Sequence, residues 1–428
     1  MNLTKQFFKY VSQNILGMIG FSCYVLADSY FISIAKGADG LTALNLVMPL
    51  YSIIFSIGEM IGVGSAIRYA ISKIKKDAYA DDYFWNALIW CILSSILFVF
   101  AGIFFSADIM RVLGADEHIV AVGNNYTKIF MCFAPMFMCN YVTNAFVRND
   151  GAPGIAMSAT LFSSLFNIVF DYILMFPMNL GMEGAALATA LSPIIGMGIC
   201  SIHFFSKKSS VRLVVCKPSV RKLVAGSQLG VSAFVGEMSS AVITLAFNFV
   251  ILKLAGNVGV AAYGVVANIA IVTTAVFNGV AQGSQPLISS CFGRGDKDGC
   301  TQLKRMGYTT AFVLAAVMYS ILFIFAEQFV AVFNSEGSEM LRLYATEGVK
   351  LYFIGIFFAG INIVGGGAFS ATEDAFKAAV VSVARGFVLI LGAVFVMSAL
   401  FGMTGVWLAY AVAEGITTFI MLVMVLRV

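Results

Sequence analysis

Charged residues are scarce in this sequence, and that scarcity excludes a water-soluble globule. Only 11% of the 428 residues are Asp, Glu, Lys or Arg, whereas 60% are hydrophobic and the mean hydropathy is +0.92. A soluble domain typically has about 25% charged residues. A chain of this length with so few cannot cover itself with polar surface. The composition therefore predicts a protein that lies in a lipid bilayer.

Histidine is nearly absent and cysteine follows no pattern, which argues against a metal centre. The chain has two histidines, His118 and His203, and eight cysteines without a C-x-x-C pair. Zinc sites need several such side chains at short spacing. We therefore expect no metal and no cofactor. The apolar segments also lack a Ser/His/Asp constellation, so an enzyme is not expected. The net charge of +4 gives no basic face for nucleic acid.

Long apolar runs fill the sequence instead. Crossing about 30 Å of hydrocarbon takes roughly 20 apolar residues as a helix. The runs are continuously apolar and lack the alternation of barrel strands. We predict an all-α polytopic membrane protein with twelve transmembrane helices. The predicted spans are residues 10–35, 42–67, 83–105, 123–147, 154–176, 184–205, 227–252, 260–288, 306–326, 349–370, 378–400 and 404–426.

Basic residues gather on one side of these spans. With a cytoplasmic N-terminus, nineteen of the 26 Lys and Arg residues lie on the cytoplasmic side, as the positive-inside rule requires. We therefore expect a multi-pass protein of the bacterial plasma membrane, with both termini in the cytoplasm. The first apolar run continues past Asp28 without a convincing cleavage site, so it is predicted to be a spanning helix and not a signal peptide.

The sequence also repeats itself. At a shift of 219 residues, Gly37 matches Gly256 and Gly64 matches Gly283. At a shift of 221, GMEGAALATAL from Gly181 matches GMTGVWLAYAV at six of eleven positions. Duplicated apolar halves are typical of secondary transporters, in which two repeats surround the substrate path.

The repeat predicts two six-helix lobes related by a pseudo-two-fold axis along the membrane normal. An even number of helices puts both ends of each half on the same side of the membrane. A basic stretch that contains Pro218 separates the halves. We therefore predict an N-lobe over residues 1–205, a cytoplasmic linker over 206–226 and a C-lobe over 227–428.

Ionisable residues inside the predicted spans are candidates for function. A charge at the centre of a spanning helix costs about 2.5–3.5 kcal/mol on insertion scales. Arg385 is the only clear basic residue of this kind. The acidic ones are Asp28, Glu59, Asp171, Glu237 and Glu414.

Four polar residues of the first half are predicted to share one layer. Asp28 and Asp171 lie at similar depths in two helices that run in the same direction. Asn167 precedes Asp171 by four residues, so both side chains lie on one helix face, and Thr189 enters the next helix at a matching depth. Two carboxylates in low dielectric cannot both stay charged cheaply. The layer is predicted to bind a coupling ion, either a shared H⁺ or Na⁺. The alternative is a set of hydrogen bonds that merely joins helices.

The other acids form no common layer. Glu59, Glu237 and Asn278 are candidates for the substrate path, and a lone acid such as Glu237 attracts cations. The alternative is that Glu237 pairs with a helix-end group or with Arg385.

Several segments resemble the MATE family, the multidrug and toxic compound extrusion transporters. The resemblance covers essentially the whole chain, with VRNDGAP and the helix after it as its most specific part, and it is closest to the bacterial DinF-like branch. The segments are LADSYFISIAKGADGLTALNLVMPL from Leu26, NAFVRNDGAPGIAMSATLFSSLFNIVFDYILMFP from Asn144, GMEGAALATA from Gly181, GVAQGSQPLISSCFGRGD from Gly279 and GMTGVWLAYAVAEG from Gly402.

This resemblance implies two six-helix lobes in a V around a central cavity, and export of drug-like, often cationic, compounds against inward H⁺ or Na⁺. It implies an ion site at the same four residues, Asp28, Asn167, Asp171 and Thr189. It also suggests an asparagine from the fourth helix, either Asn140 or Asn144. The first helix has no proline, so a mechanism that bends it at a proline is not carried over.

Two other functions are the alternatives to ion-coupled export. A lipid-linked sugar flippase of the same superfamily would be expected to have a strongly basic cavity. A membrane enzyme or receptor lacks support in the sequence. The expected partners are small organic molecules and the lipid bilayer, with the protein acting as a monomer.

Overall fold

Matched glycines turn each half of the chain back at the same end of the molecule. Helix α1 (Leu3–Ile74) is helical on both sides of Gly37, where φ is 58° and ψ is −142°. Helix α7 (Val220–Gly293) turns in the same way at Gly256, with φ 61° and ψ −157°. Glycine adopts this backbone without steric cost because it has no Cβ. The first echo in the sequence therefore marks the same turn in both halves.

The second echo marks another pair of turns. Gly181 has φ 51° where α6 begins, and Gly402 has φ 59° inside α13 (Leu389–Leu426). The predicted duplication thus appears in the backbone as well as in the sequence.

The computed structural model describes residues 3–333 and 338–426, and the regular structure in these ranges is helical. The remaining helices of the first half are α2 (Asp82–Val112), α3 (Glu117–Cys132), α4 (Ala134–Asn149), α5 (Pro153–Met175) and α6 (Gly181–Phe204). Those of the second half are α8 (Lys297–Ile324), α9 (Ala326–Phe333), α10 (Glu339–Tyr352), a 3-10 turn (Phe353–Gly355), α11 (Ile356–Ala371), α12 (Ala375–Val383) and a π-helical turn, η2 (Ala384–Val388).

The predicted all-α membrane fold with twelve transmembrane helices is confirmed. Helix α1 supplies two spans, α7 supplies two, and the stretch from α12 through α13 supplies two. Helices α3 and α4, bent by 46° against each other, form one span, and α10 with α11 forms another. Helix α7 begins at Val220, inside the stretch predicted as linker.

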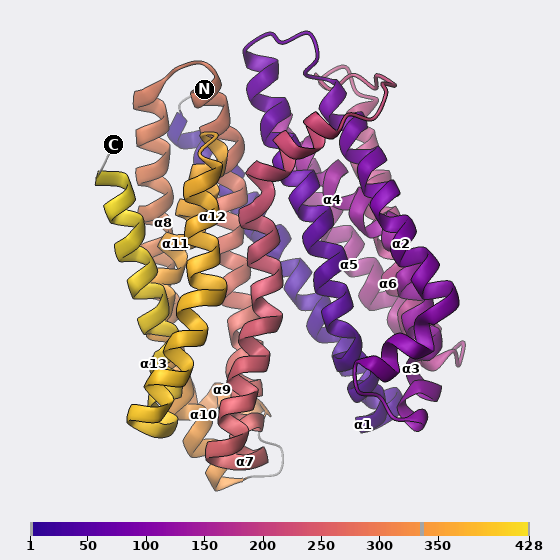
Figure 1. Ribbon diagram of the computed structural model, residues 1–428, viewed down its shortest axis with the longest axis vertical. Coiled ribbons are helices and arrows are strands. Elements are labelled where there is room, and N and C mark those ends of the chain that lie inside the picture. Colours follow the sequence, from indigo (N-terminus) through magenta and orange to yellow (C-terminus); the bar gives the residue numbers. More distant parts are fainter. Residues whose placement is uncertain (1–2, 334–337, 427–428) are drawn as a thin grey trace.

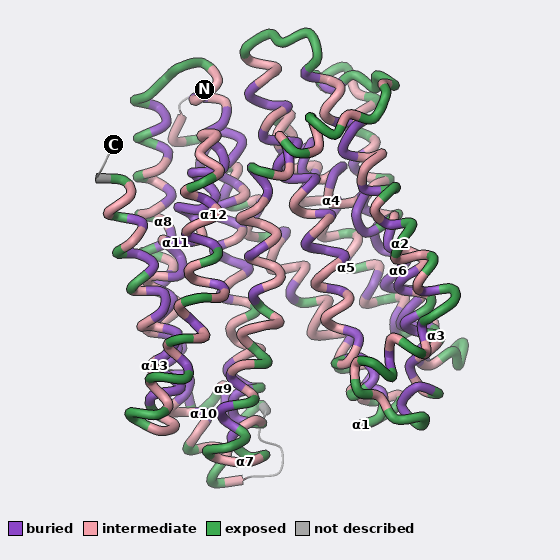
Figure 2. The backbone as a smooth tube through the Cα atoms, viewed as in Figure 1, coloured by how far each residue is buried: buried purple, intermediate pink, exposed green. Residues whose placement is uncertain are grey.

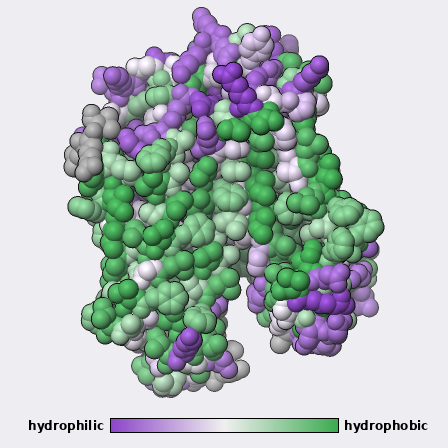
Figure 3. All heavy atoms as spheres, in the orientation of Figure 1, coloured by the Kyte–Doolittle hydropathy of each residue, from purple (hydrophilic) through white to green (hydrophobic). Residues whose placement is uncertain are grey.

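Two helical lobes lie side by side (Figure 1). The first half of the chain forms most of the N-lobe and the second half most of the C-lobe. Each lobe has an apolar core, and the cores exchange residues, since Phe7 and Val11 of α1 join the C-lobe core and Leu229 of α7 joins the N-lobe core. Buried residues lie inside each lobe, and large apolar side chains cover the outer sides (Figures 2 and 3). Exposed phenylalanines such as Phe104 and Phe419 suit a lipid environment.

The lobes touch at the end that carries the termini and separate at the other end (Figure 1). We call these the closed end and the open end. At the closed end the backbones meet at glycines. A Cβ atom added to Gly230 would lie 1.9 Å from the carbonyl oxygen of Met60, and one added to Gly283 would lie 2.7 Å from Cα of Val11. The first span of α7 therefore packs against the second span of α1, and the second span of α7 packs against the first span of α1.

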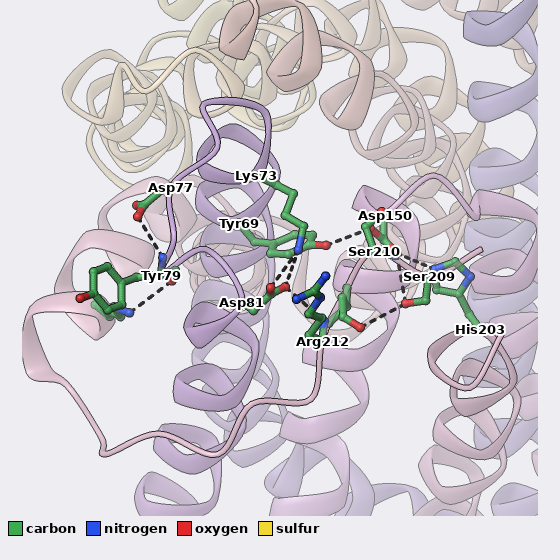
Figure 4. A network of polar contacts seen from close by, with 12 residues as sticks. Tyr69, Lys73, Asp77, Tyr79, Asp81, Asp150, His203, Ser209, Ser210 and Arg212 are labelled. Carbon is green, nitrogen blue, oxygen red and sulfur yellow. Dashed lines mark hydrogen bonds and ion pairs between the residues drawn. The ribbon is translucent and has the colours of Figure 1, made fainter. Parts of the chain in front are cut away.

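The segment between the lobes is fixed to the N-lobe (Figure 4). The buried carboxylate of Asp150 accepts hydrogen bonds from Tyr69 Oη (2.9 Å) and from the backbone N–H of Ser210 (2.8 Å), and it lies 2.8 Å from Nε2 of His203. Asp81 accepts from the N–H of Arg212 at 3.1 Å. Asp150 belongs to the VRNDGAP motif, so this motif anchors the connecting segment.

The glycine contact at Gly230 predicts opposite effects for two alanine substitutions in α7. Gly230→Ala lowers the unfolding temperature, because overpacking typically costs about 1–3 kcal/mol. Gly236→Ala leaves stability unchanged or raises it, because a Cβ there meets nothing within 4 Å and alanine favours a helix over glycine by about 0.5–1 kcal/mol. Thermal unfolding of the purified protein in detergent measures both. Equal unfolding temperatures for the two variants would contradict the close backbone contact.

Candidate functional site

The four residues of the predicted ion layer come together in the N-lobe. Asp28 extends from α1, Asn167 and Asp171 from α5, and Thr189 from α6. All four are buried, with exposed fractions of 6%, 0%, 0% and 2% in that order. The helices pack closely here: a Cβ added to Gly20 of α1 would lie 2.5 Å from Cδ2 of Leu161 in α5.

The amide of Asn167 links the residues of this layer. In the orientation that satisfies both of its ends, its nitrogen donates to Oδ2 of Asp171 at 3.0 Å. Its oxygen accepts from Oγ1 and from the backbone N–H of Thr189 at 3.1 and 3.2 Å. Asn167 therefore holds α5 and α6 in register and orients the Asp171 carboxylate.

Each carboxylate of the layer keeps one oxygen without a hydrogen-bond partner among the described residues. These atoms are Oδ1 of Asp28 and Oδ1 of Asp171, both fully enclosed, and the charge of Asp28 acts on Asp171. A buried polar atom without a partner is costly. Two such oxygens in one layer form an arrangement that a proton or a hard cation would stabilise. The described residues contain no cluster of three or more His, Cys, Asp or Glu suited to a metal ion.

Three tyrosines surround this layer, and the sequence analysis missed them. The hydroxyls of Tyr51 and Tyr126 hydrogen-bond to each other, and the ring of Tyr51 stacks on Phe130 with 3.6 Å between centroids. Tyr51 and Tyr126 lie within electrostatic range of Asp28. Tyr24 precedes Asp28 by one helical turn. The spacing of Tyr24 and Asp28 could have been recognised in the sequence. The Tyr51–Tyr126 pair could not, because it depends on how α1 packs on α3.

A cavity of about 240 Å³ lies between the lobes, and the hollow at the open end is visible in Figure 3. Thr189 and Tyr24 line it, so the ion layer borders the cavity. The predicted substrate-path residues Glu59, Glu237 and Asn278 all line it too. The aromatic residues of the lining are Phe21, Tyr24, Phe55, Phe137 and Tyr141.

Two acidic and two basic side chains line this cavity, Glu59, Glu237, Arg148 and Arg385. Glu237 makes no hydrogen bond or ion pair with another residue in the part of the chain that the structure describes, and its charge acts on Glu59. Asn278 is the repeat counterpart of Glu59, since their numbers differ by the shift of 219. The cavity is thus suited to an amphipathic cation, which has an apolar body for the rings and a positive charge for the acids.

The two asparagines proposed from the fourth helix lie in the cavity wall, apart from the ion layer. Asn144 donates to the carbonyl of Ala156 at 3.1 Å and to Oγ1 of Thr160 at 3.2 Å. Asn140 keeps its Oδ1 without a partner within the described ranges. Neither makes a hydrogen bond to the four layer residues in the described part of the chain.

Arg385 pairs with Glu414, so the alternative pairing with Glu237 is wrong. Its Nη2 and Nε lie 2.6 and 3.0 Å from Oε1 of Glu414. Asn362 donates to the other oxygen of Glu414 at 2.7 Å. Arg385 belongs to the π-helical turn η2, and its side chain reaches Glu414 of α13. Arg385 and Glu414 meet only in one register of α13 against η2, and the sequence does not reveal that register.

Arg148 is a second embedded cation, so Arg385 is not the only one. Arg148 is 4% exposed and lines the cavity from the end of α4. From the sequence, Arg148 is expected on the cytoplasmic side, because the predicted span ends at residue 147. Its guanidinium donates from Nη1 to Oε1 of Gln282, a residue that the sequence analysis did not single out.

The MatE family model matches residues 14–173 and 233–396, one segment in each lobe. The chain belongs to the MatE family.

This MatE chain has named relatives. It is 26% identical over 396 residues to a multidrug export protein MepA of Staphylococcus saprophyticus. It is 27% identical over 405 residues to the MepA of Staphylococcus aureus strain MRSA252. Both matches cover 92% of this chain and 87% of the relative.

Solved MatE-like structures share the fold. A multidrug resistance MATE family transporter of the MOP superfamily in an outward-facing conformation matches with a TM-score of 0.93 at 20% identity, over 100% of this chain and 96% of the other. A MOP superfamily transporter from Pyrococcus furiosus, for which a reversed pocket polarity suggests a different function, matches with a TM-score of 0.91 at 19% identity, over 99% and 95%.

The Arg385–Glu414 pair of this MatE protein predicts non-additive effects on stability. Glu414→Leu leaves a buried guanidinium without its counter-ion, which costs about 3–5 kcal/mol in comparable pairs. Adding Arg385→Leu restores most of this loss, because both charges are then gone. Thermal unfolding of the two single variants and the double variant measures the coupling. Glu117→Gln, which breaks the exposed pair with Arg111, serves as the control and changes little. A double variant that is less stable than either single variant would contradict the pairing.

Proposed function

We propose that the protein is a secondary active multidrug exporter, which moves drug-like, often cationic, organic compounds by antiport with H⁺ or Na⁺ through alternating access. The observation that carries the proposal is the cavity between the lobes, which is lined by the unpaired acid Glu237 and by Thr189 of the buried carboxylate layer. The relatives called multidrug export protein MepA support the same function.

Asp28 and Asp171 are the coupling residues in this proposal. When the layer holds no cation, its carboxylates repel each other and loosen α1 from α5. When it takes up a proton or Na⁺, the repulsion is removed and the helices close. The hard oxygens of Asn167 and Thr189 suit either ion. One unit charge that crosses 100 mV releases about 2.3 kcal/mol, which sustains roughly a forty-fold gradient of a neutral compound.

The protein is placed, in the same proposal, in a bacterial plasma membrane with both termini in the cytoplasm. The basic residues of the connecting segment, such as Lys207 and Lys208, support this orientation. The closed end then faces the cytoplasm and the open end faces outside. We expect the protein to act as a monomer and without catalytic activity, since each chain contains a complete cavity.

A lipid-linked sugar flippase is not favoured. It would bind a diphosphate group and would need a strongly basic cavity. The lining described here has two arginines, Arg148 and Arg385, and both are engaged by Gln282 or Glu414. Glu59 and Glu237 balance their charge.

Export of cations is tested in whole cells. When the protein is expressed in an efflux-deficient bacterial host, it lowers the accumulation of a lipophilic cationic dye such as ethidium. Glu237→Gln raises the accumulation again, because the cavity then lacks a negative charge that attracts the cation. Fluorescence of loaded cells measures both. Unchanged accumulation across a broad panel of dyes and drugs would count against export.

Coupling is tested in vesicles that contain the purified protein. Asp28→Asn and Asp171→Asn each abolish ion-driven transport, whereas Asp39→Asn, which removes an exposed carboxylate paired with His118 at the open end, leaves it intact. Dissipating the proton and the sodium gradients separately identifies the ion. Full activity of either layer variant removes that residue from the mechanism, and transport that survives the loss of both gradients overturns the coupling.

A further inference from the structure

Gln282 of the C-lobe hydrogen-bonds two charged side chains of the N-lobe. Its Nε2 donates to Oε1 of Glu59 at 3.2 Å, and its Oε1 accepts from Nη1 of Arg148 at 2.5 Å. All three side chains line the central cavity. The bridge therefore crosses from one lobe to the other within the cavity where substrate would bind.

The bridge depends on contact between the lobes. Gln282 lies between Gly279 and Gly283, and a Cβ on either glycine would lie within 2.7 Å of a backbone Cα of α1, that of Ile15 or Val11. The backbone of Gln282 is thus held against the N-lobe at the closed end. When the lobes part there, as alternating access requires, both hydrogen bonds break.

The carboxylate of Glu59 that accepts from Gln282 is also placed to attract a cation. It faces the cavity together with Glu237, whose charge acts on it, so a cationic group between the two acids would be attracted by both. The amide N–H of Gln282 occupies Oε1 of Glu59 in the present conformation. Arg148 also acts on Glu59 electrostatically. A cation therefore competes with the amide of Gln282 for the Glu59 carboxylate only while the lobes are in contact at the closed end.

Export needs a cavity that holds its substrate more weakly when it is open to the outside than when it is open to the cytoplasm. A conformational change alters affinity only through contacts that differ between the two states. The bond from Gln282 to Glu59 is such a contact, because its two partners belong to different lobes.

We propose that Gln282 is an affinity switch. When the cytoplasmic end closes, its amide is placed on Glu59, weakens the hold of the cavity on an organic cation, and favours release to the outside. This inference rests on the proposed export function. It adds Gln282 and Arg148 to the residues that determine how cations are handled.

Gln285 offers a matched control. It lies one helical turn further along α7, lines the same cavity and is 5% exposed, and its Oε1 has no partner among the residues described. It makes no bridge to Glu59 or Arg148 in those ranges. A substitution at Gln285 therefore changes the cavity without changing the switch.

The test uses inside-out vesicles with ethidium as the probe. The KM for ethidium uptake reports the cytoplasmic side, and inhibition by ethidium preloaded in the lumen reports the outward-open state. We expect Gln282→Met, which keeps the length of the side chain, to lower the luminal inhibition constant about tenfold, the usual effect of one hydrogen bond to a charged group. The cytoplasmic KM stays at the wild-type value. Gln282→Ala repeats the measurement, and Gln285→Met leaves the ratio of the two constants at the wild-type value.

Each outcome decides the matter. A luminal constant that is unchanged in both Gln282 variants overturns the switch, and so does an equal shift of both constants, which would make Gln282 an ordinary part of the cavity wall. The wild-type protein and the Glu59→Gln variant together distinguish a failure of the switch from a failure of the proposed export function. If the wild-type protein takes up no ethidium, export of cations is contradicted. If uptake is normal in Glu59→Gln, Glu59 leaves the substrate path and the switch is overturned with it.

Discussion

The cost of burying charge in a low-dielectric interior organises the polar groups of this protein. Inside a bilayer protein an ion without a partner is expensive, so embedded charges are paired unless function requires otherwise. Arg385 is neutralised by Glu414, whereas Arg148 hydrogen-bonds the neutral amide of Gln282 and keeps its Nε without a partner among the described residues. Asp28 and Asp171 each have one oxygen without a hydrogen-bond partner, and Glu237 has no ion pair, in the same part of the chain. These three acids lie in the ion layer or line the cavity, where a proton, Na⁺ or organic cation would satisfy them.

Hydropathy alone predicted the scaffold, because each span must be apolar over its whole length. The repeat added the two lobes, and its glycines proved to be the turn residues Gly37 and Gly256. The ion layer was also predictable, since Asn167 and Asp171 lie one turn apart and depth arguments bring Asp28 beside them. Pairings between distant helices were not predictable. The partner of Arg385 and the bridge at Gln282 depend on helix register, which leaves no trace in a single sequence.

The two lobes share a backbone and differ in their chemistry. Thr189 of the ion layer corresponds to Tyr410 at the shift of 221, and no acid corresponds to Asp171. The C-lobe instead holds the pair of Arg385 and Glu414, which is neutral as a unit. Within the cavity Glu59 corresponds to Asn278. The two halves thus share a scaffold, and the acidic layer of Asp28 and Asp171 has no counterpart at the equivalent positions of the C-lobe.

Helix α1 connects these parts physically. Near its start Val11 and Ile15 contact the glycines that flank Gln282, in the middle Gly17 and Gly20 contact α5, and beyond them lies Asp28. Under the proposed coupling, a change in packing between α1 and α5 on cation binding at Asp28 and Asp171 would be transmitted along this helix to the contact between the lobes. No proline interrupts this first span, and α1 is helical from Leu3 to its turn at Gly37. The same movement that loosens the closed end would withdraw Gln282 from Glu59, which links ion binding to substrate affinity through a single helix.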